Sequence, residues 1–168
     1  TTEIYTLSLH DALPISDRGI PIFTFVNKID HFGKNPFDLM ADIEDVLGIR
    51  SCPMNWPIGV NGDYTGIYDR ETEMCHLFIK DNAHGVKKLD VISGKMGDEK
   101  ITSHLAPEVI QSLKDDLELL DEAGDPFDAD KVAKGELTPM FFGSAMTNFG
   151  VQRSEEHTSE LQSRLHLV

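Results

Sequence analysis

The feature that most constrains the fold is a short apolar run that ends in a polar loop. Residues 21–26 read Pro-Ile-Phe-Thr-Phe-Val, and Asn27-Lys28-Ile29-Asp30 follows at once. An apolar run of this length, bounded by turn residues, predicts a buried β-strand. The strand and loop are followed by a helical pattern, and strand, loop and helix in that order predict an α/β fold with parallel strands.

The polar loop has the chemistry needed to recognise guanine. The Asp30 carboxylate can accept two parallel hydrogen bonds, from the ring N1–H and the exocyclic amine of that base. Adenine lacks this donor pair and would leave a desolvated carboxylate unpaired. Asn27 can bond the Hoogsteen edge or brace the loop, and the stem of Lys28 can lie flat along the base. Taken alone, the tetrapeptide also fits an ordinary turn after a strand.

A second apolar run, residues 138–142, ends in the small residues Gly143, Ser144 and Ala145. Small side chains let a main-chain amide approach a ligand, so the Ala145 amide could donate to the guanine O6. The Ser144 hydroxyl could hold the Asp30 carboxylate. Alone, this segment also fits a buried strand with a tight turn. Two such loops in this order favour a guanine-nucleotide site.

Three segments carry a resemblance to a known family. PIFTFVNKID, NWPIGV and TPMFFGSAMTNFGV resemble the bacterial class II peptide chain release factors, which are translational GTPases. Trp56 before Pro57-Ile58-Gly59, and the doubled Phe141-Phe142, resemble this family more than the related translocation factor. The resemblance covers residues 18–152.

The resemblance implies a set of functional properties. Asn27, Lys28 and Asp30 would recognise guanine, while Ser144 and Ala145 would complete the base pocket. GTP or GDP would be the ligand, and Mg²⁺ would act in the complete protein through ligands outside this chain. The ribosome and class I release factors would be the partners, and the cytoplasm would be the location.

Both ends of the chain look foreign to this family. Residues 6–15 and 153–163 match the translation of two common sequencing adapters. The adapter codons for residues 12–15 and 153–156 are reverse complements of each other, a relation that natural termini have no reason to show. We therefore expect residues 1–16 and 153–168 to be adapter-derived, and we exclude them from the fold prediction.

Between these ends, capping residues, turn residues and hydrophobic periodicity predict further elements. Asn35 can cap a helix that has Pro36 in its first turn and Gly48 at its end. Residues 65–68, 75–79 and 89–92 predict antiparallel hairpins. A helix starts at Pro107 and a shorter one covers residues 129–134. The longer helix has an apolar stripe of Ile110, Leu113, Leu117 and Leu120. The acidic residues expected to face away from that stripe are Asp115, Asp116, Glu118 and Glu122.

The expected fold class is thus a partial α/β GTPase domain, with parallel strands and helices, that carries an inserted subdomain of β-hairpins and a helix. Residues 17–51 would supply the first strand, the first guanine loop and a helix. Residues 52–137 would form the insertion, and residues 138–152 would supply the second strand and guanine loop.

Composition excludes some partners. The formal net charge is −14, of which −11 lies between the two ends. So acidic a segment argues against direct DNA binding, because nucleic-acid affinity rests largely on neutralising phosphates. No apolar run approaches membrane-spanning length and no secretory signal is visible, so no membrane partner is expected. Cys52 and Cys75 are isolated in sequence and are expected to be reduced thiols.

Phosphate-binding motifs are missing from the sequence. No G-x-x-x-x-G-K-S/T phosphate loop occurs, and Gly94-Lys95-Met96 lacks both the glycine spacing and the hydroxyl. The D-x-x-G pattern occurs at residues 30–33, 45–48, 63–66 and 121–124, but never before the Asn-Lys-x-Asp strand. His31 is expected to be a solvent-facing loop residue. We therefore expect no catalytic residue and no metal ligand here, and a chain that neither hydrolyses GTP nor binds it tightly.

Two alternatives remain at this level. The chain could derive from another translational GTPase that resembles the translocation elongation factor. It could instead be a non-catalytic docking module, in which residues 52–137 bind a protein and Asn27–Asp30 is incidental.

Overall fold

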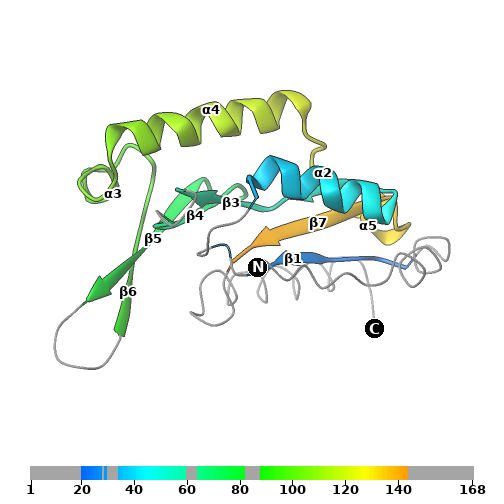
Figure 1. Cartoon of the computed structure of the whole chain (residues 1–168), viewed down its shortest axis with the longest axis horizontal. Coiled ribbons are helices and arrows are strands. Elements are labelled where there is room, and N and C mark those ends of the chain that lie inside the picture. Colours follow the sequence, from blue (N-terminus) through cyan, green and yellow to red (C-terminus); the bar gives the residue numbers. More distant parts are fainter. Residues whose placement is uncertain (1–19, 28, 30–33, 60–63, 82–87, 144–168) are drawn as a thin grey trace.

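The computed structural model describes residues 20–27, 29, 34–59, 64–81 and 88–143. Within them, two β-sheets and a group of helices form an α/β fold, which confirms the predicted fold class (Figure 1). The helices are α2 (Pro36–Leu47), α3 (Glu99–Thr102), α4 (Pro107–Ala123) and α5 (Ala129–Ala133).

The first sheet is parallel and has β7 at its centre. Its strands are β1 (Thr24–Val26), β7 (Leu137–Phe142) and β2 (Arg50–Pro53), in that spatial order. All six residues of β7 are buried, as expected for a central strand of a parallel sheet that is covered on both faces. The central strand therefore reads as a mostly apolar run in the sequence.

The second sheet is antiparallel and follows β2 directly. Its strands pair in chain order: β3 (Asn55–Ile58), β4 (Gly66–Asp69), β5 (Met74–Asp81) and β6 (Lys88–Gly94). The last three are the predicted hairpin strands. The short strands β2 and β3 and the one-turn helix α3 were not predicted.

Helix α2 shows why local signals predicted its limits well. The Asn35 side chain accepts a hydrogen bond from the Phe37 N–H at 2.9 Å and so caps the first turn. Pro36 occupies the first helical position, where no N–H is needed. At the other end Gly48 adopts the left-handed conformation, with φ of 68°, that ends helices without a Cβ clash.

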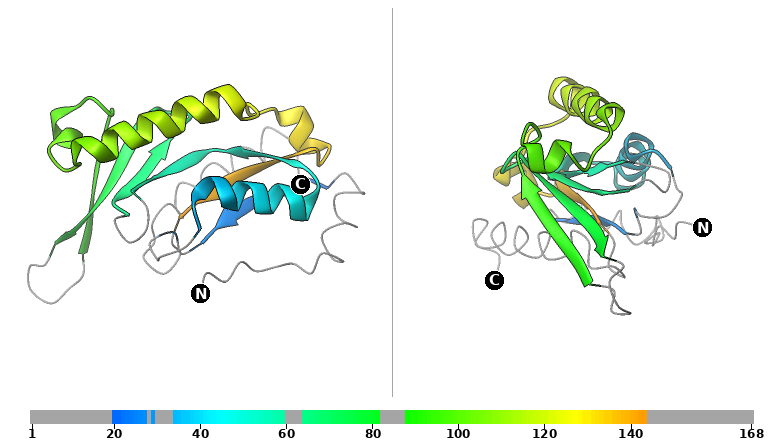
Figure 2. Two further views of the ribbon diagram at one scale, coloured as in Figure 1. Left: turned by 45° about the horizontal axis from the view of Figure 1, so that its top comes forward. Right: turned by 90° about the vertical axis from the view of Figure 1, so that its left-hand side faces the viewer.

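The larger of two buried clusters joins the two sheets. Helices α2 and α4 lie on the same side of them (Figures 1 and 2). Leu39 of α2 and Leu113 and Leu120 of α4 belong to one buried cluster that includes Trp56 of β3 and Phe142 of β7. The predicted apolar stripe of α4 is thus confirmed as its packing face.

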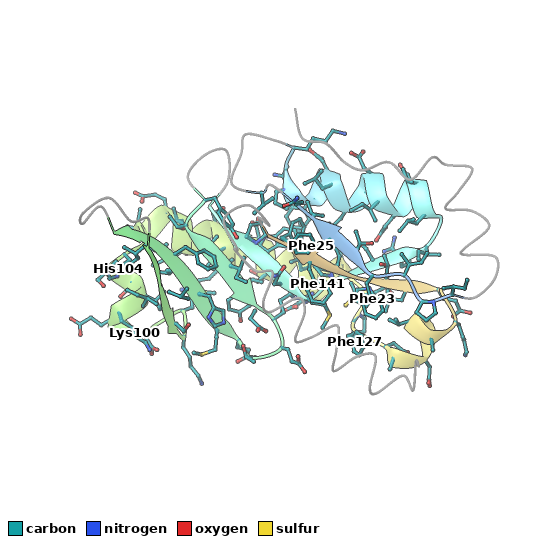
Figure 3. All side chains as sticks on the ribbon, turned by 90° about the horizontal axis from the view of Figure 1, so that it is seen from below. Phe23, Phe25, Lys100, His104, Phe127 and Phe141 are labelled. Atoms are coloured by element: carbon teal, nitrogen blue, oxygen red, sulfur yellow. The ribbon has the colours of Figure 1, made fainter. Side chains whose placement is uncertain are left out.

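A smaller cluster covers the opposite face of the parallel sheet. Phe141 of β7 is buried there beside Phe23 and Phe127, and the three rings gather on the face that Figure 3 presents. Cys52 belongs to this cluster, whereas Cys75 belongs to the larger one. Both cysteines are buried and free, and burial raises the pKa of each thiol to about 11.

Candidate functional site

The candidate site begins where β1 and β7 end. The two strands are parallel, and their register pairs Val26 with Phe142, the last residue of each. Asn27 and Gly143 therefore leave the sheet at the same edge. Ligands of α/β sheets bind at this edge, outside the carboxyl ends of parallel strands.

Two main-chain hydrogen bonds join the turns beyond these strands. The Gly143 N–H donates to the Val26 carbonyl at 3.0 Å, and the Ile29 N–H donates to the Gly143 carbonyl at 3.2 Å. Ile29 also packs against the main core. Ile29, which lies between Lys28 and Asp30, is thus bonded to Gly143, which immediately precedes Ser144.

The predicted site residues are only partly within the described structure. Asn27 lies directly after β1 and is half-buried. Lys28, Asp30, Ser144 and Ala145 lie outside the described residues. The structure brings together their described neighbours, Ile29 and Gly143, through a main-chain hydrogen bond.

Asn55 supports the end of β7 from the other side, a role that sequence reasoning missed. Its side-chain Oδ1 accepts from the Phe142 N–H at 2.7 Å, and its Nδ2 donates to the Phe142 carbonyl at 3.1 Å. Asn55 is 4% exposed, so these bonds are shielded from water. A single buried Asn has no periodicity or motif that could reveal such a role.

Trp56, next to Asn55, connects β7 to two helices. Its ring centroid lies 4.7 Å from that of Phe37 in α2 and 5.3 Å from that of Phe142 in an edge-on contact. Its indole N–H donates to Asp116 Oδ2 in α4 at 3.0 Å. The prediction that Asp116 faces away from the packed side is therefore wrong: the indole reaches the flank of the stripe and gives this carboxylate a partner.

The segments rejected above as phosphate-binding motifs have structural roles within the described part of the chain. The Lys95 N–H donates to Asp98 Oδ2 at 2.9 Å, in the turn that precedes α3. Asp121 pairs with Arg70 at 2.7 Å, and the Gly124 N–H closes α4 on the Leu120 carbonyl at 2.8 Å. His31 lies outside the described residues.

Two negative findings apply to the described ranges only. No three His, Cys, Asp or Glu side chains gather there in a way that could hold a metal ion. No helix in those ranges has the length and hydropathy needed to cross a membrane.

The fold places the chain among α/β proteins with a parallel sheet and an attached hairpin sheet. The crystal structure of ttk003000868 from Thermus thermophilus matches it with a TM-score of 0.52 at 18% identity, over 86% of this chain and 22% of that one. At this identity the match shows the fold alone. No protein-family model matches the chain.

Sequence comparison identifies the particular relatives, which are named Peptide chain release factor 3. The protein from Symbiobacterium thermophilum is 50% identical over 145 residues, which is 86% of this chain and 27% of that protein. The one from Gloeobacter violaceus is 47% identical over 151 residues, 89% of this chain and 28% of that protein. The one from Gloeothece citriformis is 46% identical over 135 residues, 80% and 25% respectively.

These matches confirm the resemblance to the class II release factors. The chain is homologous to one segment of release factor 3, and it spans about a quarter of the length of the curated relatives it matches.

Proposed function

We propose that this segment supplies the guanine-recognition half of a translational GTPase that acts as release factor 3, recycling class I release factors from the ribosome after termination. The observation that carries the proposal is the pair of hydrogen bonds that ties Gly143 to Val26 and Ile29. Because of these bonds, the two loops with guanine-recognising chemistry start from the same edge of one sheet. Homology to release factor 3 supplies the cellular context.

Within this proposal each site residue has a defined task. Asp30 accepts hydrogen bonds from N1–H and the exocyclic amine of guanine, and the Ala145 amide donates to O6. Ser144 holds the Asp30 carboxylate. Asn27 braces the first loop or bonds the Hoogsteen edge, and the stem of Lys28 lies along the base.

The complete protein would also bind Mg²⁺ and the phosphates of GTP, and would act in the cytoplasm. This sequence has no phosphate loop, so the residues that hold those groups belong to other parts of the protein. We assign no catalytic residue and no metal ligand to this chain.

The proposed organisation follows from the same reasoning. Residues 17–51 and 138–152 belong to the GTPase domain and residues 52–137 to an insertion, while residues 1–16 and 153–168 are adapter-derived. Support comes from the parallel pairing of β1 with β7 and from the hairpin sheet that follows β2.

The proposal is tested by an Asp30→Asn exchange in a complete protein. The host is the Symbiobacterium thermophilum release factor 3 in which residues 18–152 of this chain replace the matching segment; we call this protein the graft. An Asn side chain donates where Asp accepts, and xanthine carries a carbonyl where guanine carries the amine. The variant should therefore reverse a preference for GDP over xanthosine diphosphate that we expect to be about a hundredfold or more.

The matched control is Asp45→Asn, which removes the same charge from an exposed position on α2. It should leave the preference unchanged when both diphosphates compete with a fluorescent GDP analogue. An unchanged preference in Asp30→Asn would contradict the proposal and would favour the docking-module alternative.

A further inference from the structure

The connection between β2 and β3 places the Asn55 side chain beside β7, where the main chain of β2 would otherwise continue. β2 pairs with β7 as far as Pro53, which lies opposite Met140, and the Met54 N–H donates to the Met140 carbonyl at 2.8 Å. The chain then turns away into β3 and the hairpin sheet. From this point no main chain of β2 is left to pair with Phe142.

The Asn55 carboxamide fills that place. It accepts from the Phe142 N–H at 2.7 Å and donates to the Phe142 carbonyl at 3.1 Å. A carboxamide offers the same donor and acceptor as a peptide group, so the side chain extends the ladder by one residue. Phe142 is fully buried, and a buried peptide group without partners would be costly.

Phe142, the last residue of β7, and Gly143, which follows it, bond to opposite neighbours. Phe142 directs both of its main-chain groups to Asn55, on the β2 side. Gly143 directs both of its groups to the β1 side, where Val26 accepts and Ile29 donates. Phe142 is thus held from the β2 side by Asn55, and Gly143 is held from the β1 side by Val26 and Ile29.

We propose that Asn55 is a positioning residue that sets where the second guanine loop leaves the sheet, and so aligns the Ala145 amide with the guanine O6. This proposal rests on the proposed function. Asn55 bonds the β7 side directly, whereas the first loop follows β1 and is reached only through the bonds of Gly143 to Val26 and Ile29. Loss of Asn55 should therefore weaken recognition at O6 more than recognition by Asp30.

The test compares affinity ratios in the graft. The ratio of GDP to 6-thioguanosine diphosphate reports on O6, because sulfur is a weaker acceptor while N1–H and the amine are unchanged. The ratio of GDP to inosine diphosphate reports on Asp30, because inosine lacks only the amine. Each single contact is expected to be worth about five- to tenfold in affinity.

Asn55→Ala should lower the thioguanine ratio to about twofold or less and leave the inosine ratio within about twofold of the unsubstituted graft. Asn55→Asp keeps the size and the acceptor but loses the donor and faces the Phe142 carbonyl with a charge. It should have the same effect, and it carries the test if Asn55→Ala does not fold. Affinity ratios do not depend on the folded fraction, so partial unfolding does not imitate the result.

Ser51→Ala is the matched control. It removes a buried hydroxyl that donates to Glu44 Oε1 at 2.8 Å, in the neighbouring strand β2 but away from Phe142. Both ratios should stay unchanged in this variant. Asn55 variants that keep the thioguanine ratio, or that lower both ratios together, would overturn the positioning role. Failure of the proposed function looks different: the unsubstituted graft would then prefer GDP to neither analogue.

Discussion

At the scale of single residues, Gly66 shows a position where only glycine fits. A Cβ built on Gly66 would lie 2.2 Å from the carbonyl oxygen of His76 in the neighbouring strand β5. Because the obstacle is main chain within a four-stranded sheet, it cannot move aside as a side-chain end could. The close approach of β4 to β5 therefore depends on the missing side chain.

We predict that Gly66→Ala destabilises the chain by about 1–3 kcal/mol or more, the usual cost of overpacking. Gly97→Ala is the control, because a Cβ there would meet nothing within 4 Å. It should leave the free energy of unfolding within about 0.5 kcal/mol of the unsubstituted chain. Urea unfolding of the three proteins gives the comparison, and equal losses in the two variants would contradict the role of close approach.

Residues whose partners are near in sequence could be predicted, and those with distant partners could not. Asn35 bonds the main chain two residues ahead, so the pattern around it was enough to place the cap. Asn55 bonds a residue 87 positions away, and nothing in its own neighbourhood indicates that contact. The proposed guanine loops could be inferred from the sequence because a local run of residues carries their chemistry. The support that Asn55 gives to the end of β7 could not be inferred in this way.

At the scale of elements, the link between β3 and α4 runs through the indole of Trp56 and the carboxylate of Asp116. The indole ring is fully buried and Asp116 is half-buried. A hydrogen bond to a charged group in such a place stabilises more than one between neutral groups. This bond joins the hairpin sheet to the helix that covers it.

We predict that Trp56→Phe and Asp116→Ala interact in a double-mutant cycle by about 1–3 kcal/mol. Pairing Trp56→Phe with Asp115→Ala gives the control, because Asp115 lies on the exposed side of α4 and bonds Gln111 instead. That second cycle should give a coupling below about 0.5 kcal/mol. A negligible coupling in the first cycle would mean that the indole bond contributes nothing to stability.

Elements with a clear hydrophobic periodicity, or with capping and turn residues at their ends, were predicted well. Short or fully buried elements were missed. Helices α2 and α4 have prolines in their first turns and an apolar face, and β4, β5 and β6 are separated by turn residues. The missed strands β2 and β3 are four residues each and contain a proline apiece, and seven of their eight residues are buried. Burial on both faces removes the alternation by which a strand is recognised. Helix α3 is a single turn, too short for any periodicity.

At the scale of the whole molecule, the parallel sheet and the hairpin sheet share one core. The cluster that contains Val26 and Phe142 also contains Ile58, Leu77 and Leu113. The proposed insertion therefore does not pack as a separate body, and its packing reaches the ends of β1 and β7, after which the proposed guanine loops begin. This continuity is what lets a residue of β3 act on the end of β7.

We predict that purified residues 17–152 show no magnesium-dependent GTP hydrolysis. The phosphate cradle, a magnesium ligand and a group that positions the attacking water are all required, and the motifs for them are missing from this sequence. Release of inorganic phosphate from GTP measures the activity, with the graft as positive control. Turnover that depends on magnesium and is lost in Asp30→Asn would show that the chain holds catalytic groups that we have not assigned.

The most direct test of the central claim is a crystal structure of the graft with GDP. The claim is that the loops after β1 and β7 meet on one guanine base. The measured quantities are the distances from the Asp30 oxygens to N1 and the exocyclic amine, and from the Ala145 nitrogen to O6. We predict that all three are about 2.7–3.2 Å, within hydrogen-bond range. A base that contacts only one of the two loops, or that binds elsewhere, would contradict the account.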